Sequence, residues 1–182
     1  MRAAESSSTE RAKQDDLYRS VADQYGSAIQ RLARAYEADG EKRRDLIQEI
    51  HFQLWRSFER FNARCSLRTW TYRVAHHVAV SHVLRERRTL AKLVSLEELE
   101  AIPGQNEACF ATNRCRNLEQ LSALIQRLKP IDRQVIISYL EDLDAVSIGE
   151  ITGLSPAGVA MRVHRVKKIL ARWFREGENH AR

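Results

Sequence analysis

The strongest chemical signal in the sequence is the segment GLSPAGVAMRVHRVKKIL, residues 153–170, in which valines alternate with arginine, histidine and lysine. Its apolar residues fall on one predicted helix face at i, i+4, i+7, i+11 and i+14: Val159, Val163, Val166, Leu170 and Trp173. Between positions 156 and 175 there are six lysines or arginines and no acidic residue. Like charges on adjacent turns of a helix repel each other, and a polyanion bound along this face would offset that repulsion and release counterions. The segment therefore favours a nucleic acid as partner.

The residues that precede this helix have the spacing of a helix-turn-helix motif. Ser155 is a good N-cap and Pro156 suits the first helical position, so the second helix is expected to begin there. Gly149 is small enough to let two helices cross closely, and Gly153 permits the positive φ of a tight turn. The second helix of such a motif enters the major groove, here with Ala157, Ala160, Met161, Arg162, His164 and Arg165. The alternative is a solvated basic helix in an ordinary bundle.

A second candidate surface lies in DLIQEIHFQLW, residues 45–55, where polar side chains lie opposite an apolar stripe. Asp45, Gln48 and Glu49 share the polar side of the predicted helix, and Leu46 and Ile50 belong to the apolar side. In a basic protein such a patch is either a solvated face or a docking surface.

A third candidate, SLRTWTYRVAHHVAVSHVLRERR, residues 66–88, mixes aromatic residues with arginines. Aromatic rings stack on unpaired bases while arginines follow the phosphates, so this composition suits single-stranded DNA. Trp70, at the start of an amphipathic helix, fits a core position equally well. The residues alone leave both interpretations open.

The composition favours an all-α protein, because the 182 residues contain only three prolines and seven glycines. The net charge of +6 agrees with a polyanionic partner. Three cysteines, an odd number, fit a reduced intracellular chain better than a disulfide scaffold. The polar N-terminus lacks the apolar segment of a signal peptide, and no apolar run approaches the ~20 residues that span a membrane. A cytoplasmic location is expected.

Two small helical domains joined by a flexible linker are expected. The divisions are a disordered N-terminus (1–16), a first domain (17–88), a linker (89–117), a second domain (118–175) and a tail (176–182). Periodicity predicts three helices in the first domain, with a break at Asp39–Gly40 and a loop at 62–66 in which Ser66 is a possible N-cap. In the second domain the first helix is expected to stop at Lys129–Pro130.

Neither a metal site nor a catalytic centre is expected. His76 and His77 are adjacent, so on a helix they point about 100° apart and cannot easily share an ion. Cys109 and Cys115 have five residues between them, which is not a zinc-binding spacing. The sequence has no phosphate-binding glycine loop, no partnered nucleophile and no paired carboxylates in a plausible cleft, which disfavours an enzyme.

Taken together, these segments resemble a bacterial RNA polymerase sigma factor of the sigma-70 family, in the extracytoplasmic-function (ECF) class. Residues 45–55 resemble the part of region 2 that binds the polymerase, and residues 66–88 the adjoining part that melts and reads the −10 element. Residues 128–170 resemble region 4, the helix-turn-helix that reads the −35 element. The resemblance covers roughly residues 25–88 and 118–174.

The resemblance implies transcription initiation by binding core RNA polymerase and both promoter elements, control by an anti-sigma factor, and no cofactor. The residues implied in core-polymerase binding are Asp45, Gln48, Glu49 and Trp55. Those implied at the −10 element are Asn62, Arg64, Arg68, Thr69, Trp70, Arg73, His76 and His77. Those implied at the −35 element are Ser155, Ala160, Met161, Arg162, His164, Arg165 and Lys168.

Some positions depart from the family pattern. Ala160 and Met161 stand where the family commonly has a polar or basic pair, which predicts more reliance on DNA shape and phosphate contacts at the −35 element. His77 stands where the family commonly has asparagine. Two other functions are kept as alternatives. A dimeric helix-turn-helix regulator would need neither the 45–55 patch nor the Trp70 segment, and a nucleic-acid-processing enzyme would need a catalytic cluster.

Overall fold

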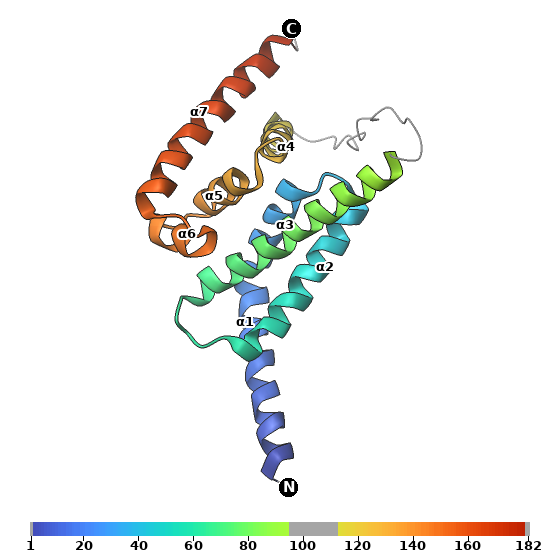
Figure 1. Cartoon of the computed structure of the whole chain (residues 1–182), viewed down its shortest axis with the longest axis vertical. Helices are drawn as coiled ribbons and strands as arrows, with labels where there is room; N and C mark the ends of the chain where they lie inside the picture. Colours follow the sequence, from blue (N-terminus) through green and yellow to red (C-terminus); the bar gives the residue numbers. More distant parts are fainter. Residues whose placement is uncertain (1, 95–112, 181–182) are drawn as a thin grey trace.

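The computed structural model describes the backbone of residues 2–94 and 113–180 and the side chains of residues 11–88 and 118–173. Its elements are α1 (Arg2–Tyr36), α2 (Gly40–Ser57), the 3-10 turn η1 (Phe58–Arg60), α3 (Leu67–Val94), α4 (Asn113–Gln126), α5 (Pro130–Leu140), α6 (Ala145–Thr152) and α7 (Pro156–His180). Every element within these ranges is helical, which confirms the predicted all-α class. Figure 1 shows α1–α3, the N-terminal half, beside α4–α7, the C-terminal half.

The N-terminal half is a bundle in which α1, α2 and α3 pack against one another (Figure 1). Leu32, Leu46 and Ile50 are at most 1% exposed, because their helical spacing turns one apolar stripe of each helix inward. The Asp39 side chain caps α2 by accepting a hydrogen bond from the Lys42 N–H at 2.9 Å. Ser66 caps α3 in the predicted manner, since its Oγ accepts from the Thr69 N–H at 3.0 Å.

The first 16 residues differ from the expected disordered segment, because α1 begins at Arg2. The Gln14 side chain is only 5% exposed and donates to the Trp55 carbonyl at 2.7 Å. The Trp55 indole N–H in turn donates to Asp15 Oδ1 at 2.8 Å. Polar side chains thus attach the first part of α1 to the end of α2. A polar composition does not by itself predict that these residues pack against another helix.

In the C-terminal half, α6 and α7 form the predicted helix-turn-helix. Asp144 caps α6 by accepting from the Ser147 N–H at 2.7 Å, and this hydrogen bond lowers the pKa of Asp144. Gly153 has φ +75°, the left-handed conformation that the tight turn requires. Ser155 Oγ accepts from the Gly158 N–H at 3.2 Å, and Pro156 is the first residue of α7.

Gly149 is the second glycine that the motif requires. A Cβ atom at this position would lie 2.6 Å from the Leu154 carbonyl oxygen, which belongs to the backbone of the turn and cannot easily move. We expect Gly149→Ala to lower the free energy of unfolding by about 1–3 kcal/mol, as overpacking does. The matched control is Gly26→Ala in α1, where a Cβ meets nothing within 4 Å and alanine is expected to stabilise the helix. Equal unfolding midpoints for Gly149→Ala and the wild type in urea would contradict this close crossing.

The segment predicted as a linker is shorter than expected at both ends. Helix α3 continues to Val94, and α4 begins at Asn113. Residues 95–112, including Cys109, lie outside the described part of the chain. Helix α5 begins at Pro130, so this proline starts a helix as well as ending the preceding segment.

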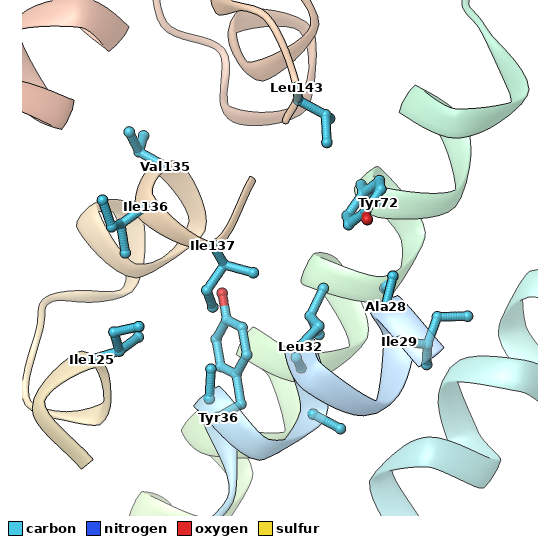
Figure 2. Packing of buried hydrophobic residues seen from close by; sticks show 14 of the residues in the cluster. Ala28, Ile29, Leu32, Tyr36, Tyr72, Ile125, Val135, Ile136, Ile137 and Leu143 are labelled. Carbon is cyan, nitrogen blue, oxygen red and sulfur yellow. The ribbon is translucent and has the colours of Figure 1, made fainter. Parts of the chain in front are cut away.

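The two halves share one apolar cluster, which the expectation of two tethered domains does not include. Figure 2 shows Ile137 of α5 facing Leu32 and Tyr36 of α1, and Leu143 facing Tyr72 of α3. All five side chains are at most 6% exposed. Burial of this apolar surface stabilises the arrangement of the halves.

Candidate nucleic-acid interface

Helix α2 presents the predicted acidic and polar patch. Asp45, Gln48 and Glu49 are exposed, while the intervening Leu46 and Ile50 point into the core. This arrangement confirms that the patch is an outer helix face.

Two further aromatic residues of α2 differ in their accessibility. Phe52 lies at i+3 from Glu49 and i+4 from Gln48 and is 53% exposed, so it adds an apolar contact to the same face. Phe52 was not among the residues predicted from the sequence, although its spacing from Gln48 and Glu49 places it on their face of the helix. Trp55 is half-buried, and the hydrogen bond from its indole to Asp15 holds it against α1.

A groove of about 740 Å³ runs between α2 and α3. Asp45 and Glu49 line it from α2, and Arg73 and His77 line it from α3. The structure therefore brings together two residues predicted to bind core polymerase and two predicted to contact the −10 element. The His77 side chain is exposed along this groove.

The loop between η1 and α3 holds the next group of predicted −10 residues. Asn62 and Arg64 are exposed, and Asn62 Oδ1 accepts from the Arg64 N–H at 3.3 Å around Ala63, which has φ 56°. Behind this loop Thr69 is only 2% exposed, and the Trp70 indole N–H donates to Ser57 Oγ at 2.9 Å. Asn62 and Arg64 are thus accessible, whereas Thr69 and Trp70 support the loop.

His76 lies in the interface between the halves and not on the surface. Its ring is fully buried, with Nδ1 3.0 Å from the Tyr36 hydroxyl and Nε2 3.0 Å from Ser138 Oγ on α5. Burial lowers the pKa of His76 to about 3, so the imidazole is neutral at pH 7. In this conformation His76 cannot contact DNA.

Glu141, at the end of α5, makes several polar contacts with the N-terminal half. Its carboxylate accepts from Arg31 Nε and Nη2, each at 2.6 Å, and from the Tyr72 hydroxyl at 3.1 Å. The hydrogen bond to Glu141 raises the pKa of Arg31. Arg68 donates to the Glu141 backbone carbonyl. Arg68, a predicted −10 residue, is therefore bound to the C-terminal half.

Arg73, another predicted −10 residue, also faces the C-terminal half. Its guanidinium lies 4.0 Å from Glu150 of α6, at the limit of an ion pair. Three of the eight predicted −10 residues, Arg68, Arg73 and His76, thus lie against the C-terminal half. Three others remain exposed: Asn62, Arg64 and His77.

The burial of His76 predicts an acid-sensitive fold. Between its folded pKa of about 3 and its ordinary value of 6.5, the unfolded chain binds a proton that the folded chain does not. The stabilisation is complete above pH 6.5 and is lost as the pH falls, by about 2 kcal/mol at pH 5. Urea unfolding at pH 7 and pH 5 measures this loss. It should be much smaller in His76→Gln than in His77→Gln, and equal losses in the two variants would contradict the assignment.

The Glu141 contacts predict a second measurable effect. Glu141→Ala removes the acceptor for Arg31 and Tyr72, and we expect the ratio of separated to packed halves to rise about tenfold, since one charged hydrogen-bonded group is lost near the surface. Energy transfer between dyes on the exposed faces of α2 and α7 measures the separation. The matched control is Glu59→Ala on η1, which is exposed and lies in the N-terminal half. Equal transfer efficiencies in the two variants would contradict a restraining function of Glu141.

The predicted −35 residues, with Ser155 at the N-cap and the others on α7, divide into two groups. Ser155, Ala160, Met161, His164 and Lys168 are exposed, with Met161 72% exposed. Arg162 and Arg165, with side chains 30% and 56% exposed, form the second group, since both donate to Asp132 Oδ1 on α5, at 2.7 and 2.9 Å. The contact with Asp132 was not predicted from the sequence, because Asp132 lies 30 residues before Arg162 and has no periodic relation to it.

Metal-binding clusters and membrane-spanning helices are both absent from the described part of the chain. Within residues 11–88 and 118–173, no group of three His, Cys, Asp or Glu side chains is placed to hold a metal ion. None of the helices in the described ranges is long and apolar enough to cross a membrane.

Comparison with known proteins gives two family matches, one in each half of the chain. The sigma-70 region 2 family matches residues 21–89, and the sigma-70 region 4 family matches residues 118–170. The ECF RNA polymerase sigma factor SigW of Bacillus subtilis (strain 168) is 20% identical over 169 residues, 88% of this chain and 90% of SigW. RNA polymerase sigma factor YlaC of the same organism is 25% identical over 154 residues, 84% of this chain and 87% of YlaC.

Two solved structures share the fold. CnrH, in complex with the cytosolic domain of CnrY, superposes with a TM-score of 0.66 at 14% identity, over 93% of this chain and 94% of CnrH. The sigma factor RpoE, co-crystallised with the anti-sigma factor NepR from Bartonella quintana, superposes with a TM-score of 0.64 at 17% identity, over 82% of this chain and 91% of RpoE. The two family matches fall on the two halves of the fold, α1–α3 and α4–α7, and together with the curated relatives they show that the chain belongs to the sigma-70 family and is an RNA polymerase sigma factor of the ECF class.

Proposed function

We propose that this sigma factor divides its contacts between two helix faces: α2 binds core RNA polymerase, and α7 binds the −35 duplex. The observation that carries the proposal is the separation of charge. The exposed face of α2 carries Asp45, Gln48 and Glu49, whereas α7 has no acidic residue between positions 156 and 175. The carboxylates of Asp45 and Glu49 disfavour a polyanion at their face of α2, whereas α7 attracts one.

Residues of α3 and of the loop before it are proposed to hold the melted −10 strand. Asn62, Arg64 and His77 are accessible in this conformation, and the loop that carries Asn62 and Arg64 is proposed to bind an extruded base. Arg68 and Arg73 face the C-terminal half. Contact of Arg68 and Arg73 with the −10 element therefore requires the two halves to separate. Separated halves could also bind the −10 and −35 elements at the same time.

A conformation in which the halves are packed together is proposed to suit an anti-sigma factor. RpoE, which has the same fold, was crystallised with the anti-sigma factor NepR. A partner that binds both halves would stabilise this conformation, because its affinity for the packed halves would exceed its affinity for the separated halves. We propose that the protein acts in the cytoplasm and itself catalyses no reaction.

Site-specific crosslinking tests the division of contacts. A photoreactive phenylalanine analogue at position 52 is expected to crosslink to core polymerase, and the same analogue at position 161 to −35 DNA, in one promoter complex. The native residues Phe52 and Met161 are 53% and 72% exposed, so either position accepts the analogue without disturbing the core. The control is position 118 of α4, where Leu118 is 53% exposed but lies outside both faces. Absence of polymerase crosslinks from position 52 would overturn the assignment of α2.

A further inference from the structure

Asp132 is a buried carboxylate that contacts two predicted DNA-binding arginines. It is the third residue of α5 and only 7% exposed. Its Oδ1 accepts from Arg162 Nη1 at 2.7 Å and from Arg165 Nη2 at 2.9 Å. A carboxylate this buried requires paired charge, and α7 supplies two cations for one anion.

The two arginines keep most of their hydrogen-bonding capacity. The side chain of Arg162 is 30% exposed and that of Arg165 is 56% exposed, so both guanidinium groups reach the surface beside the exposed face of α7. A guanidinium has five N–H donors, and each arginine gives one to Asp132. The remaining donors are available to a base edge or a phosphate.

The shared carboxylate restrains the two side chains. Arg162 and Arg165 lie at i and i+3 on α7, where like charges repel and long side chains are otherwise free to change rotamer. Attachment to one oxygen atom offsets the repulsion and fixes both guanidinium groups before DNA arrives. Preorganised side chains lose less entropy on binding.

The two positions before Arg162 offer little hydrogen bonding to base edges, so the polar candidates between positions 160 and 165 are Arg162, His164 and Arg165. Ala160 has no hydrogen-bonding side-chain atom, and the Met161 thioether is only a weak acceptor. Arginine is the side chain that most often reads guanine, through O6 and N7 in the major groove. Such bidentate contact requires a fixed orientation of the guanidinium plane.

We propose that Asp132 is a positioning residue for −35 recognition: by holding Arg162 and Arg165 as a pair, it gives the sigma factor its discrimination for guanine in the −35 duplex. This inference rests on the proposed −35 function of α7. Without Asp132 the two arginines keep their charge and their attraction to phosphate, but they lose their common orientation.

The test is selection of promoters from a library randomised at the −35 element, by holoenzyme reconstituted with the full chain. We expect Asp132→Asn to reduce the preference for the selected −35 bases about tenfold, as loss of an oriented bidentate contact does. Its −10 preference should be unchanged, and its binding to a scrambled −35 duplex should be equal or tighter. The matched control is Asp142→Asn on the exposed loop after α5, where φ is 55° and asparagine is well tolerated.

Two further variants make the outcome decisive. In an Arg162→Ala, Arg165→Ala background, Asp132→Asn should cause no additional loss of −35 preference, because the groups that it positions are absent. Asp132→Glu keeps the charge but shifts the carboxylate by one methylene, and it should also change the preference if Asp132→Asn proves unstable. A wild-type −35 profile in Asp132→Asn, or in Asp132→Glu where the first variant does not fold, would overturn the inference. Absence of any −35 preference in the wild-type holoenzyme would instead contradict the proposed function of α7.

Discussion

Replacement of Asp45 and Glu49 by arginine is expected to weaken binding to core RNA polymerase by at least about 100-fold, because disruption of each interfacial charge contact costs about 2–5 kcal/mol. Both side chains are exposed on α2 and neither contributes to the hydrophobic core, so the fold should be retained. The measurement is titration of labelled chain with purified core enzyme, together with urea unfolding of the free chain.

The control for this prediction has the same change in net charge elsewhere on the surface. Glu59→Arg with Asp23→Arg alters two exposed acidic residues outside the α2 patch. We expect core binding in this control to remain within about threefold of the wild type, since isolated surface charges contribute little. If both double variants bound core enzyme equally well, the polymerase-binding surface would have to lie elsewhere.

Replacement of Arg162 and Arg165 by alanine is expected to have the second-largest effect, a loss of about 30-fold or more in −35-dependent promoter binding. Two arginine–base contacts worth about 1 kcal/mol or more each give this factor. The double change also leaves Asp132 buried without these two partners, so the triple variant that adds Asp132→Asn separates lost DNA contacts from lost stability.

Promoter binding by reconstituted holoenzyme, with and without the −35 element, measures this second effect. Core binding by the free chain should be unchanged in both the double and the triple variant, because α2 is untouched. A loss of core binding that equals the loss of promoter binding would show that α7 does not act on DNA as proposed.

Local features of the fold were predictable from the sequence because neighbouring residues produce them. The Ser155 cap, the αL turn at Gly153 and the close crossing at Gly149 each depend on residues within one or two turns. The outward face of α2 followed from periodicity for the same reason. Phe52 belongs to that face, but the prediction for this face was limited to Asp45, Gln48, Glu49 and Trp55 and did not include it.

Contacts between distant segments could not be predicted in the same way. His76 was expected beside DNA, and its burial depends on Ser138, 62 residues further along the chain. Arg31 and Glu141 are 110 residues apart, and no periodic pattern relates them. The helical start of α1 was missed because its packing uses polar side chains such as Gln14, which composition assigns to a disordered segment.

The central claim is that one chain confers promoter-specific initiation by joining core polymerase through its N-terminal half to −35 DNA through its C-terminal half. Run-off transcription with core enzyme, the purified chain and a randomised promoter library tests it most directly. The account predicts transcripts that depend on the chain and whose templates share both a −10 and a −35 sequence, with the −35 sequence lost in the Arg162→Ala, Arg165→Ala variant. No chain-dependent transcripts from any template in the library would contradict it.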